Sequence, residues 1–132
     1  MKIIWYGHSC FEITGNDGTV IFDPYQEGSV PGLNKLHLKG NLVLCSHEHE
    51  DHNARNCVET TAKDFKVTCI ETYHDHHLGS HRGKNTIHIL TYENMKVVHM
   101  GDIGCMIDDL SKIKNCDVLM IPIGGYYTID TK

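Results

Sequence analysis

The segment 47–52 holds the densest group of potential metal ligands in the chain, and it follows a continuous apolar run that is typical of a buried strand. His47 and His49 are two residues apart, so in an extended segment their imidazoles project to the same side and can chelate one cation. Asp51 and His52 come next, where a turn into a helix is expected. Their side chains can therefore bind a second metal ion beside the first. The segment therefore predicts two adjacent metal positions rather than a solvated acidic loop.

Two further positions, His74 and Asp102, are predicted to complete this site. Each follows an expected strand, the first after 67–73 and the second after 96–100. His74 would add a third imidazole to the first metal, and the carboxylate of Asp102 would bridge both metals. A single His or Asp at a strand end is more often a cap or a turn residue, but the 47–52 segment upstream favours ligand roles for both.

The elements that must position these side chains are mainly strands. Period-two alternation and β-branched residues indicate most of them, and turn-favouring residues at 15–18 and 92–95 predict two hairpins. The runs 41–45 and 118–123 are apolar enough that burial on both faces is expected. The expected elements are strands at 2–6, 10–14, 19–22, 41–45, 65–72, 85–92, 96–100 and 117–123, helices at 53–61 and 108–114, and one helical turn at 33–38.

Composition limits the classes of protein to which this chain can belong. The 132 residues include 40% hydrophobic and 22% charged side chains, which predicts one small globular domain and excludes a disordered tail. The formal net charge of -5 disfavours nucleic acid as a partner, and no apolar run is long enough to span a membrane. The first ten residues lack the basic and apolar regions of a secretory signal, so a cytoplasmic protein is expected.

Further short motifs accompany the 47–52 segment along the chain. They are Gly7 to Phe11, Asp23-Pro24, His74-Asp75, Arg82 to Asn85, Gly101-Asp102 and residues 117–125. With these motifs in this order, the chain resembles the metallo-β-lactamase superfamily of metal-dependent hydrolases, and within it the compact branch related to L-ascorbate-6-phosphate lactonase. The resemblance implies an α+β fold, the four-layered αββα sandwich of that superfamily.

The resemblance also implies a ligand set. One metal would be held by three histidines, a second by a carboxylate and a histidine, and one carboxylate would bridge the two. The resemblance assigns His47, His49 and His74 to the first metal and Asp51 and His52 to the second. Asp102 would be the bridging carboxylate, and Asp51 and Asp102 would be the catalytic carboxylates.

Three other side chains are candidates for binding substrate. In this branch of the superfamily His8 would lie close to the metals, although a surface or core histidine is an equally good interpretation. Arg82 would hold a substrate phosphate or else lie at a solvated hairpin tip. Tyr126 would line the pocket or pack in a simple turn.

The sequence departs from the superfamily near its end. The later part of the fold supplies a further helix, a strand and a last His ligand, and no such elements are found before Lys132. We therefore expect a single domain at 1–132 that forms the N-terminal portion of the sandwich and lacks its C-terminal part. Without the C-terminal part, an apolar face of the domain would be exposed to water. About 400 Å² of such surface corresponds to roughly 10 kcal/mol of lost burial free energy, so we expect a homo-oligomer that covers it.

These observations predict a metal-dependent hydrolase. Two divalent ions, Zn²⁺ in the first place and Mn²⁺ or Fe²⁺ as alternatives, would supply hydroxide that attacks an ester, a lactone or a phosphodiester. The substrate would be a small anionic molecule. One alternative is a truncated metal-binding domain with weak or no turnover, and a further alternative is a nuclease-like phosphodiesterase.

Overall fold

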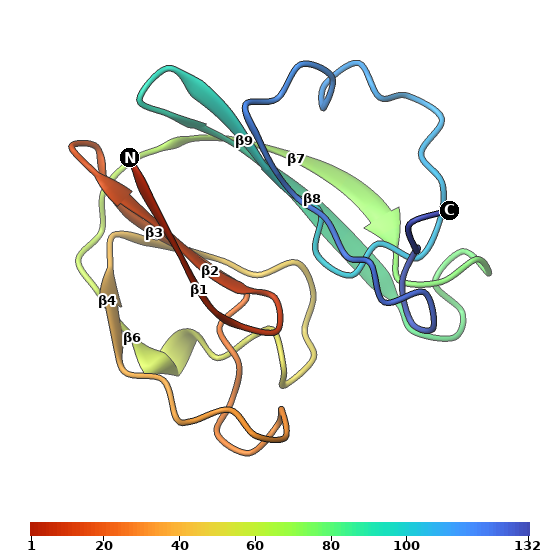
Figure 1. The fold of residues 1–132 in the computed structure, drawn as a ribbon, viewed down its shortest axis with the longest axis horizontal. Helices are drawn as coiled ribbons and strands as arrows, with labels where there is room; N and C mark the ends of the chain where they lie inside the picture. Colours follow the sequence, from red (N-terminus) through yellow and green to blue (C-terminus); the bar gives the residue numbers. More distant parts are fainter. The chain divides into compact units, whose positions relative to one another are not determined.

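The computed structural model describes residues 1–132, which divide into two compact units. The first unit comprises Met1–Phe65 and the second comprises Lys66–Lys132. In Figure 1 the first unit is coloured red to yellow-green and the second green to blue. Both units consist of strands and loops, and the chain contains one 3-10 turn and no α-helix.

The main sheet of the first unit has four strands in the order β1-β2-β3-β5. β1 (Lys2–Gly7), β2 (Cys10–Gly15) and β3 (Gly18–Phe22) form an antiparallel meander. β5 (Leu42–Leu44) pairs with β3 in the parallel direction. The predicted hairpin at 15–18 is confirmed, since Gly15 and Gly18 are partners in the ladder.

A second, smaller sheet belongs to the same unit. β4 (Leu38–Gly40) pairs in parallel with β6 (Val58–Thr60), and the 3-10 turn η1 (Arg55–Cys57) directly precedes β6. No strand is predicted from the sequence at the position of β4, and a helix is predicted at 53–61. Val58 and Thr60 are β-branched and fit a paired strand better than a helix.

The core of the first unit lies against β3. All three residues at the end of this strand, Val20, Ile21 and Phe22, are fully buried, because β3 lies between β2 and β5. A buried cluster extends from it to the loops and consists of Cys10, Ile21, Tyr25, Leu36 and Val58. The prediction that the run 41–45 is buried on both faces is wrong. β5 is the edge strand of its sheet, and its residues are only half-buried.

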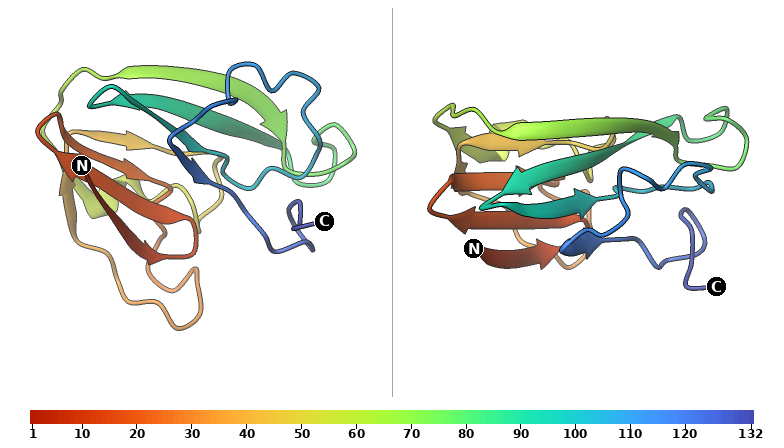
Figure 2. Two further views of the ribbon diagram at one scale, coloured as in Figure 1. Left: turned by 45° about the horizontal axis from the view of Figure 1, so that its top comes forward. Right: turned by 90° about the horizontal axis from the view of Figure 1, so that it is seen from above.

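The second unit contains one sheet in the order β10-β9-β8-β7 (Figure 2). β7 (Lys66–Tyr73), β8 (Lys84–Tyr92) and β9 (Met95–His99) are antiparallel neighbours, and β10 (Val118–Met120) pairs in parallel with β9. β10 is an edge strand and is shorter than predicted, so the expected burial of the run 118–123 on both faces is also wrong.

Alternating apolar residues of β8 and β9 build the core of the second unit. The buried cluster consists of Ile87, Ile89, Val98, Met100, Ile103 and Ile113. The predicted hairpin at 92–95 is confirmed, since Tyr92 pairs with Met95. Glu93 and Asn94 have φ values of 47° and 62°, the left-handed conformation that a two-residue hairpin turn requires.

The predicted helices do not form. The segment 33–38 is a loop that leads into β4, and 53–61 contains only η1 before it becomes β6. At 108–114 a single turn closes through hydrogen bonds from the backbone N–H groups of Ile113 and Lys114 to the carbonyl of Leu110. Such short segments do not sustain a helix unless an apolar face packs against a neighbour. The chain therefore consists of strands and loops, and the helices expected for an α+β fold are absent from it.

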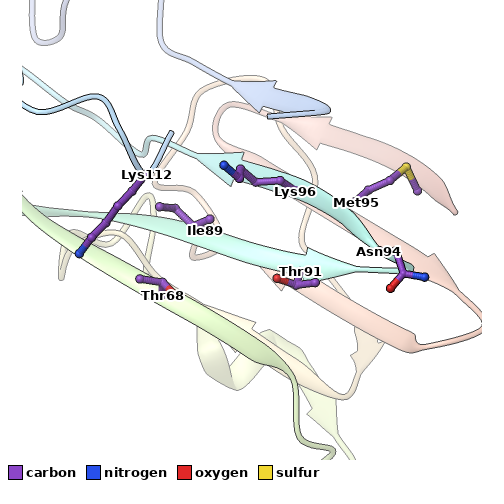
Figure 3. Close-up of a pocket in the computed structure, with 7 residues that line it drawn as sticks. All are labelled: Thr68, Ile89, Thr91, Asn94, Met95, Lys96 and Lys112. Carbon is purple, nitrogen blue, oxygen red and sulfur yellow. The ribbon is translucent and has the colours of Figure 1, made fainter. Parts of the chain in front are cut away.

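One face of the second sheet is hollowed. A cavity of about 420 Å³ lies over β7, β8 and β9, with Thr68, Ile89, Thr91, Asn94, Met95, Lys96 and Lys112 around it (Figure 3). None of the predicted site residues lines this cavity. The structure contains no helix with the length and apolarity that crossing a membrane would require.

Candidate metal centre

The end of a parallel strand pair forms the base of the candidate site in the first unit. Phe22 at the end of β3 is the partner of Leu44 at the end of β5. Because parallel strands end at the same edge of a sheet, Asp23 and Ser46, which follow them, lie close together. The backbone N–H of Asp23 donates to the carbonyl of Leu44 at 3.0 Å, which completes this edge.

Asp23 is the buried anchor of the site. Its side chain is fully enclosed, and its φ of 43° lies in the left-handed region, which aspartate adopts more often than most other non-glycine residues. Oδ1 accepts from the backbone N–H of Ser46 at 2.7 Å, and Oδ2 accepts from the Ser46 hydroxyl at 2.5 Å. Oδ2 also accepts from Nδ1 of His52 at 2.7 Å.

These hydrogen bonds determine the tautomers of two histidines. A carboxylate only accepts, so His52 carries its proton on Nδ1 and presents a lone pair on Nε2. The Ser46 hydroxyl donates to Asp23 and therefore accepts from Nδ1 of His47, which lies 2.8 Å from Oγ. His47 thus also presents Nε2 as a lone pair, the arrangement in which an imidazole binds a metal.

The histidines of the 47–52 segment gather into one group, although the sequence pattern assigns His52 to a neighbouring metal position. The ring centroids of His47 and His49 are 4.5 Å apart, and those of His47 and His52 are 4.1 Å apart. His47 and His52 are buried, whereas His49 is exposed. The segment is a series of bends closed by the bond from the N–H of His52 to the carbonyl of His49 at 2.9 Å, rather than an extended strand followed by a helix.

His8 reaches the same group from the turn between β1 and β2. Its Nε2 lies 2.9 Å from Oδ2 of Asp51 and 3.2 Å from Nε2 of His52. Burial by itself would raise the pKa of Asp51, but the neighbouring imidazoles of His52 and His8 outweigh it and hold that pKa well below its ordinary value. The carboxylate of Asp51 is therefore ionised throughout the neutral pH range.

The residues of the first unit fit a divalent transition metal on the chemistry of their donor atoms. Imidazole nitrogens and carboxylate oxygens are its preferred ligands, and the tautomers fixed by Asp23 present the lone pairs that such a metal needs. A buried carboxylate behind a ligating imidazole is also the usual outer support of metal sites in proteins.

The second unit brings His74 and Asp102 together. β7 and β9 are separated by one antiparallel strand and run in the same direction, so the residues after their ends share one edge of the sheet. Nε2 of His74 lies 3.2 Å from Oδ2 of Asp102, and both side chains are largely buried. Nδ1 of His74 donates to the carbonyl of Tyr127 at 3.1 Å, which directs Nε2 toward Asp102.

Two residues that the sequence does not mark as functional hold this pair. The backbone N–H of Asp102 donates to Oδ1 of buried Asn85 at 2.9 Å, and the amide of Asn85 donates to the carbonyl of Met100 at 2.9 Å. Gly104 packs so closely against the chain that a Cβ there would lie 2.5 Å from the carbonyl carbon of His74. Only glycine permits this approach.

The loop after His74 is organised by Asp75. Its carboxylate accepts hydrogen bonds of 2.7 to 3.0 Å from four backbone N–H groups, those of His77, Gly79, His81 and Arg82. Burial raises the pKa of Asp75, but these four donors outweigh it and lower the pKa well below the ordinary value. The loop conformation therefore depends on an ionised Asp75.

The two predicted substrate-binding residues of the second unit both contact the ring of Tyr127. The guanidinium of Arg82 lies over the ring of Tyr127, 4.9 Å from its centroid, and the ring of Tyr126 meets that of Tyr127 edge-on at 4.6 Å. Tyr126 is 77% exposed. Tyr127, which also accepts the hydrogen bond from His74, was not among the predicted site residues.

Sequence reasoning also missed Asp23 and Ser46. The signals for them are present but modest. Asp23 precedes Pro24 at a strand end, and Ser46 directly precedes His47. Neither residue type in such a place points to a metal site, because the contact between them spans 23 positions and depends on the pairing of β3 with β5.

Comparison with known proteins defines the class. Residues 2–132 match the family described as the Beta-lactamase superfamily domain, and the chain belongs to this family. This confirms the predicted membership of the metallo-β-lactamase superfamily.

Two relatives of this chain are both named UPF0173 metal-dependent hydrolase. A UPF0173 metal-dependent hydrolase of Thermoplasma acidophilum is 26% identical over 168 residues, covering 98% of this chain and 74% of the relative. One of Natranaerobius thermophilus is 26% identical over 165 residues, covering 98% of this chain and 73% of the relative.

A solved structure shares the fold. It is that of a proposed Zn-dependent hydrolase of the metallo-beta-lactamase superfamily from Thermotoga maritima, with 27% sequence identity and a TM-score of 0.69. The match covers 97% of this chain and 64% of that protein, so the chain spans less than two thirds of the length of this structural relative.

Proposed function

We propose that this chain carries the metal-binding site of a metal-dependent hydrolase. The observation that carries the proposal is the group anchored on Asp23, in which His47 and His52 are fixed in the tautomer that offers Nε2 to a metal. The names of the relatives support the same activity.

The proposed ligand set follows the sequence prediction. His47, His49 and His74 hold one metal, Asp51 and His52 hold a second, and Asp102 bridges them. Support for these assignments comes from within each unit, from the grouped imidazoles of the first and the contact of 3.2 Å between His74 and Asp102 in the second. Nitrogen and oxygen ligands suit Zn²⁺ and also accept Mn²⁺ or Fe²⁺.

Divalent metals, when bound, lower the pKa of water toward neutrality and polarise the oxygen of the group under attack. The contribution of Asp51 follows from its depressed pKa, because a carboxylate that stays ionised orients water by accepting its hydrogen bond. Asp102 supplies negative charge beside His74 and resists displacement through its bond to Asn85.

The proposed substrate is a small anionic ester, lactone or phosphodiester. Arg82 is the proposed anion-binding group, since its guanidinium is held over the ring of Tyr127 and offers a planar fork of N–H donors that suits phosphate and carboxylate groups. Tyr126, exposed beside the same ring, offers a phenol hydroxyl, and His8 offers an imidazole next to Asp51.

The first test is metal content. The purified chain and a His47→Ala/His49→Ala variant are compared by elemental analysis after equilibration with Zn²⁺. We expect a marked loss of zinc in the variant, because two of the proposed ligands to one metal are gone. A His37→Ala/His76→Ala variant, which removes two exposed histidines, serves as the matched control. Equal zinc in all three proteins would refute the proposed site.

The second test is turnover of a lactone, a carboxylate ester and a simple phosphodiester, each with and without added metal. Metal-dependent hydrolysis of any of them supports the proposed function, and the preferred substrate names the bond that is cleaved. Cleavage of the phosphodiester alone would indicate a nuclease-like enzyme. Stoichiometric metal binding without turnover of any substrate would indicate a metal-binding domain instead.

A further inference from the structure

His8 occupies a turn position with a left-handed backbone conformation. It is the first residue of the two-residue turn between Gly7 and Cys10, which are partners in the β1–β2 ladder. Its φ is 51°, a left-handed conformation that is uncommon among non-glycine residues. The turn is held by a bond from the indole N–H of Trp5 to the carbonyl of His8 at 2.9 Å.

The turn places Nε2 of His8 close to two other potential ligand atoms, Oδ2 of Asp51 and Nε2 of His52. Oδ2 of Asp51 lies 2.9 Å from Nε2 of His8 and 3.5 Å from Nε2 of His52, and the two nitrogens are 3.2 Å apart. Ligands at about 2.0–2.2 Å from a tetrahedral Zn²⁺ are separated from one another by roughly 3.3 Å. The triangle therefore has the dimensions of one face of a metal coordination shell.

The protonation of the triangle agrees with this interpretation. Nε2 of His52 presents a lone pair because Nδ1 donates to Asp23, and the carboxylate of Asp51 only accepts. The hydrogen bond from His8 to Asp51 therefore uses the N–H of His8. In the other tautomer of His8, with its proton on Nδ1, a divalent cation between the three atoms would satisfy all of them at once.

We propose that His8 is a third protein ligand, beside Asp51 and His52, for the second metal position. The inference rests on the proposed function, which places a metal on Asp51 and His52, and it assigns to His8 a direct contact with that metal rather than a contact with substrate. All three ligands belong to the first unit of the chain.

The variant that tests this inference is His8→Gly. Glycine suits a φ of 51°, so the substitution removes the imidazole without straining the turn, and the backbone bond from Trp5 is retained. His37→Ala, at an exposed histidine of the same unit, is the matched control. Asp51→Asn serves as the positive control, because it removes a proposed carboxylate ligand of the same second metal position.

The decisive measurement is nuclear magnetic resonance of the cadmium-loaded protein with isotope-labelled histidine. A ligating nitrogen shows scalar coupling to the cadmium nucleus, which a histidine that only hydrogen-bonds to Asp51 does not show. We expect His8→Gly to lose one coupled nitrogen and His37→Ala to lose none. We also expect Cd²⁺ affinity at this position to fall by more than about 100-fold, the upper end of what the loss of an outer partner causes.

The outcomes separate this inference from the proposed function. If the cadmium-coupled nitrogens of His8→Gly and the unmodified chain are the same while Asp51→Asn loses metal, the role given to His8 is overturned and the metal site stands. If the unmodified chain binds no Cd²⁺ or Zn²⁺, the proposed function itself fails, and the inference with it.

Discussion

Oδ2 of Asp23 accepts a hydrogen bond of 2.7 Å from Nδ1 of His52, and neither side chain is exposed to solvent. The same oxygen accepts the hydroxyl proton of Ser46, whose oxygen in turn faces His47. One buried carboxylate thus sets the orientation of two of the proposed metal ligands. Its removal affects both the stability of the fold and the affinity of the site.

For Asp23→Asn, we expect the free energy of unfolding to fall by about 3 kcal/mol, because an amide cannot accept all three hydrogen bonds. Zinc affinity should fall by about 10–100-fold, the usual cost of losing the partner of a ligating histidine. Chemical denaturation and competition with a chelator measure these two quantities. Asp64→Asn, at an exposed position, should change neither. Unaltered zinc affinity in a folded Asp23→Asn protein would contradict the anchoring role.

For Asp102→Ala, we expect kcat/KM to fall by about 100-fold or more with a small loss of thermal stability. The side chain contributes one carboxylate to a partly open site, while the backbone bond to Asn85 is retained. Activity and melting temperature are measured on the same preparation. A collapsed melting temperature together with full activity of the folded fraction would show that the role of Asp102 is structural.

Gly104→Ala should displace His74, because the new Cβ would lie 2.5 Å from the carbonyl carbon of that residue. We expect a loss of at least about 1–3 kcal/mol in the free energy of unfolding, the usual cost of overpacking, together with weaker metal binding. Gly124→Ala is the matched control, since its Cβ would make only an ordinary contact at 3.5 Å with Thr128. Equal behaviour of the two variants would contradict the close packing at Gly104.

Tyr6 should make stability fall at alkaline pH. Burial, together with the hydrogen bond of 2.7 Å that its hydroxyl donates to Glu12, raises the pKa of Tyr6 from 10.0 to about 12. Because the fold favours the neutral phenol, its contribution to stability is complete below pH 10 and is lost as the pH rises to about 12.

The test of this pH dependence is the ultraviolet titration of tyrosinate in the unmodified chain and in Tyr6→Phe. The difference between the two curves should be one phenol that titrates near pH 12, and Glu12→Gln should move that phenol toward pH 10. A difference curve centred at pH 10 would show that Tyr6 is not shifted.

The 132-residue chain is predicted to self-associate. Leu119, Ile121 and Ile123 alternate along the edge strand β10 and the residues after it, and they are 43%, 45% and 68% exposed. An apolar row beside unpaired strand backbone favours association with another chain. Sedimentation should show a dimer or larger species at micromolar concentration, and Ile121→Lys/Ile123→Lys should shift it toward monomer more than Leu78→Lys does. A monomeric unmodified chain would contradict the prediction.

Sequence reasoning predicts the features of this protein that depend on neighbours in the chain. The hairpins at 15–18 and 92–95 follow from local turn chemistry, and the strands follow from period-two patterns. The proximity of His47 and His49 agrees with their separation of two residues, although the segment is a series of bends and not the extended strand on which that expectation rests. The short helices expected at 53–61 and 108–114 do not form, because a segment of that length takes its conformation from the elements that pack against it.

Only the tertiary structure determines the contacts between residues that are far apart in the sequence. The runs 41–45 and 118–123 are less buried than their composition predicts, because their strands lie at sheet edges. Asp23 becomes the anchor of the site because β3 and β5 pair in parallel and end together, which brings it to Ser46 and His52 from 23 and 29 positions away. A contact of this kind leaves no periodic pattern in the sequence, since it depends on which strands pair and in which direction.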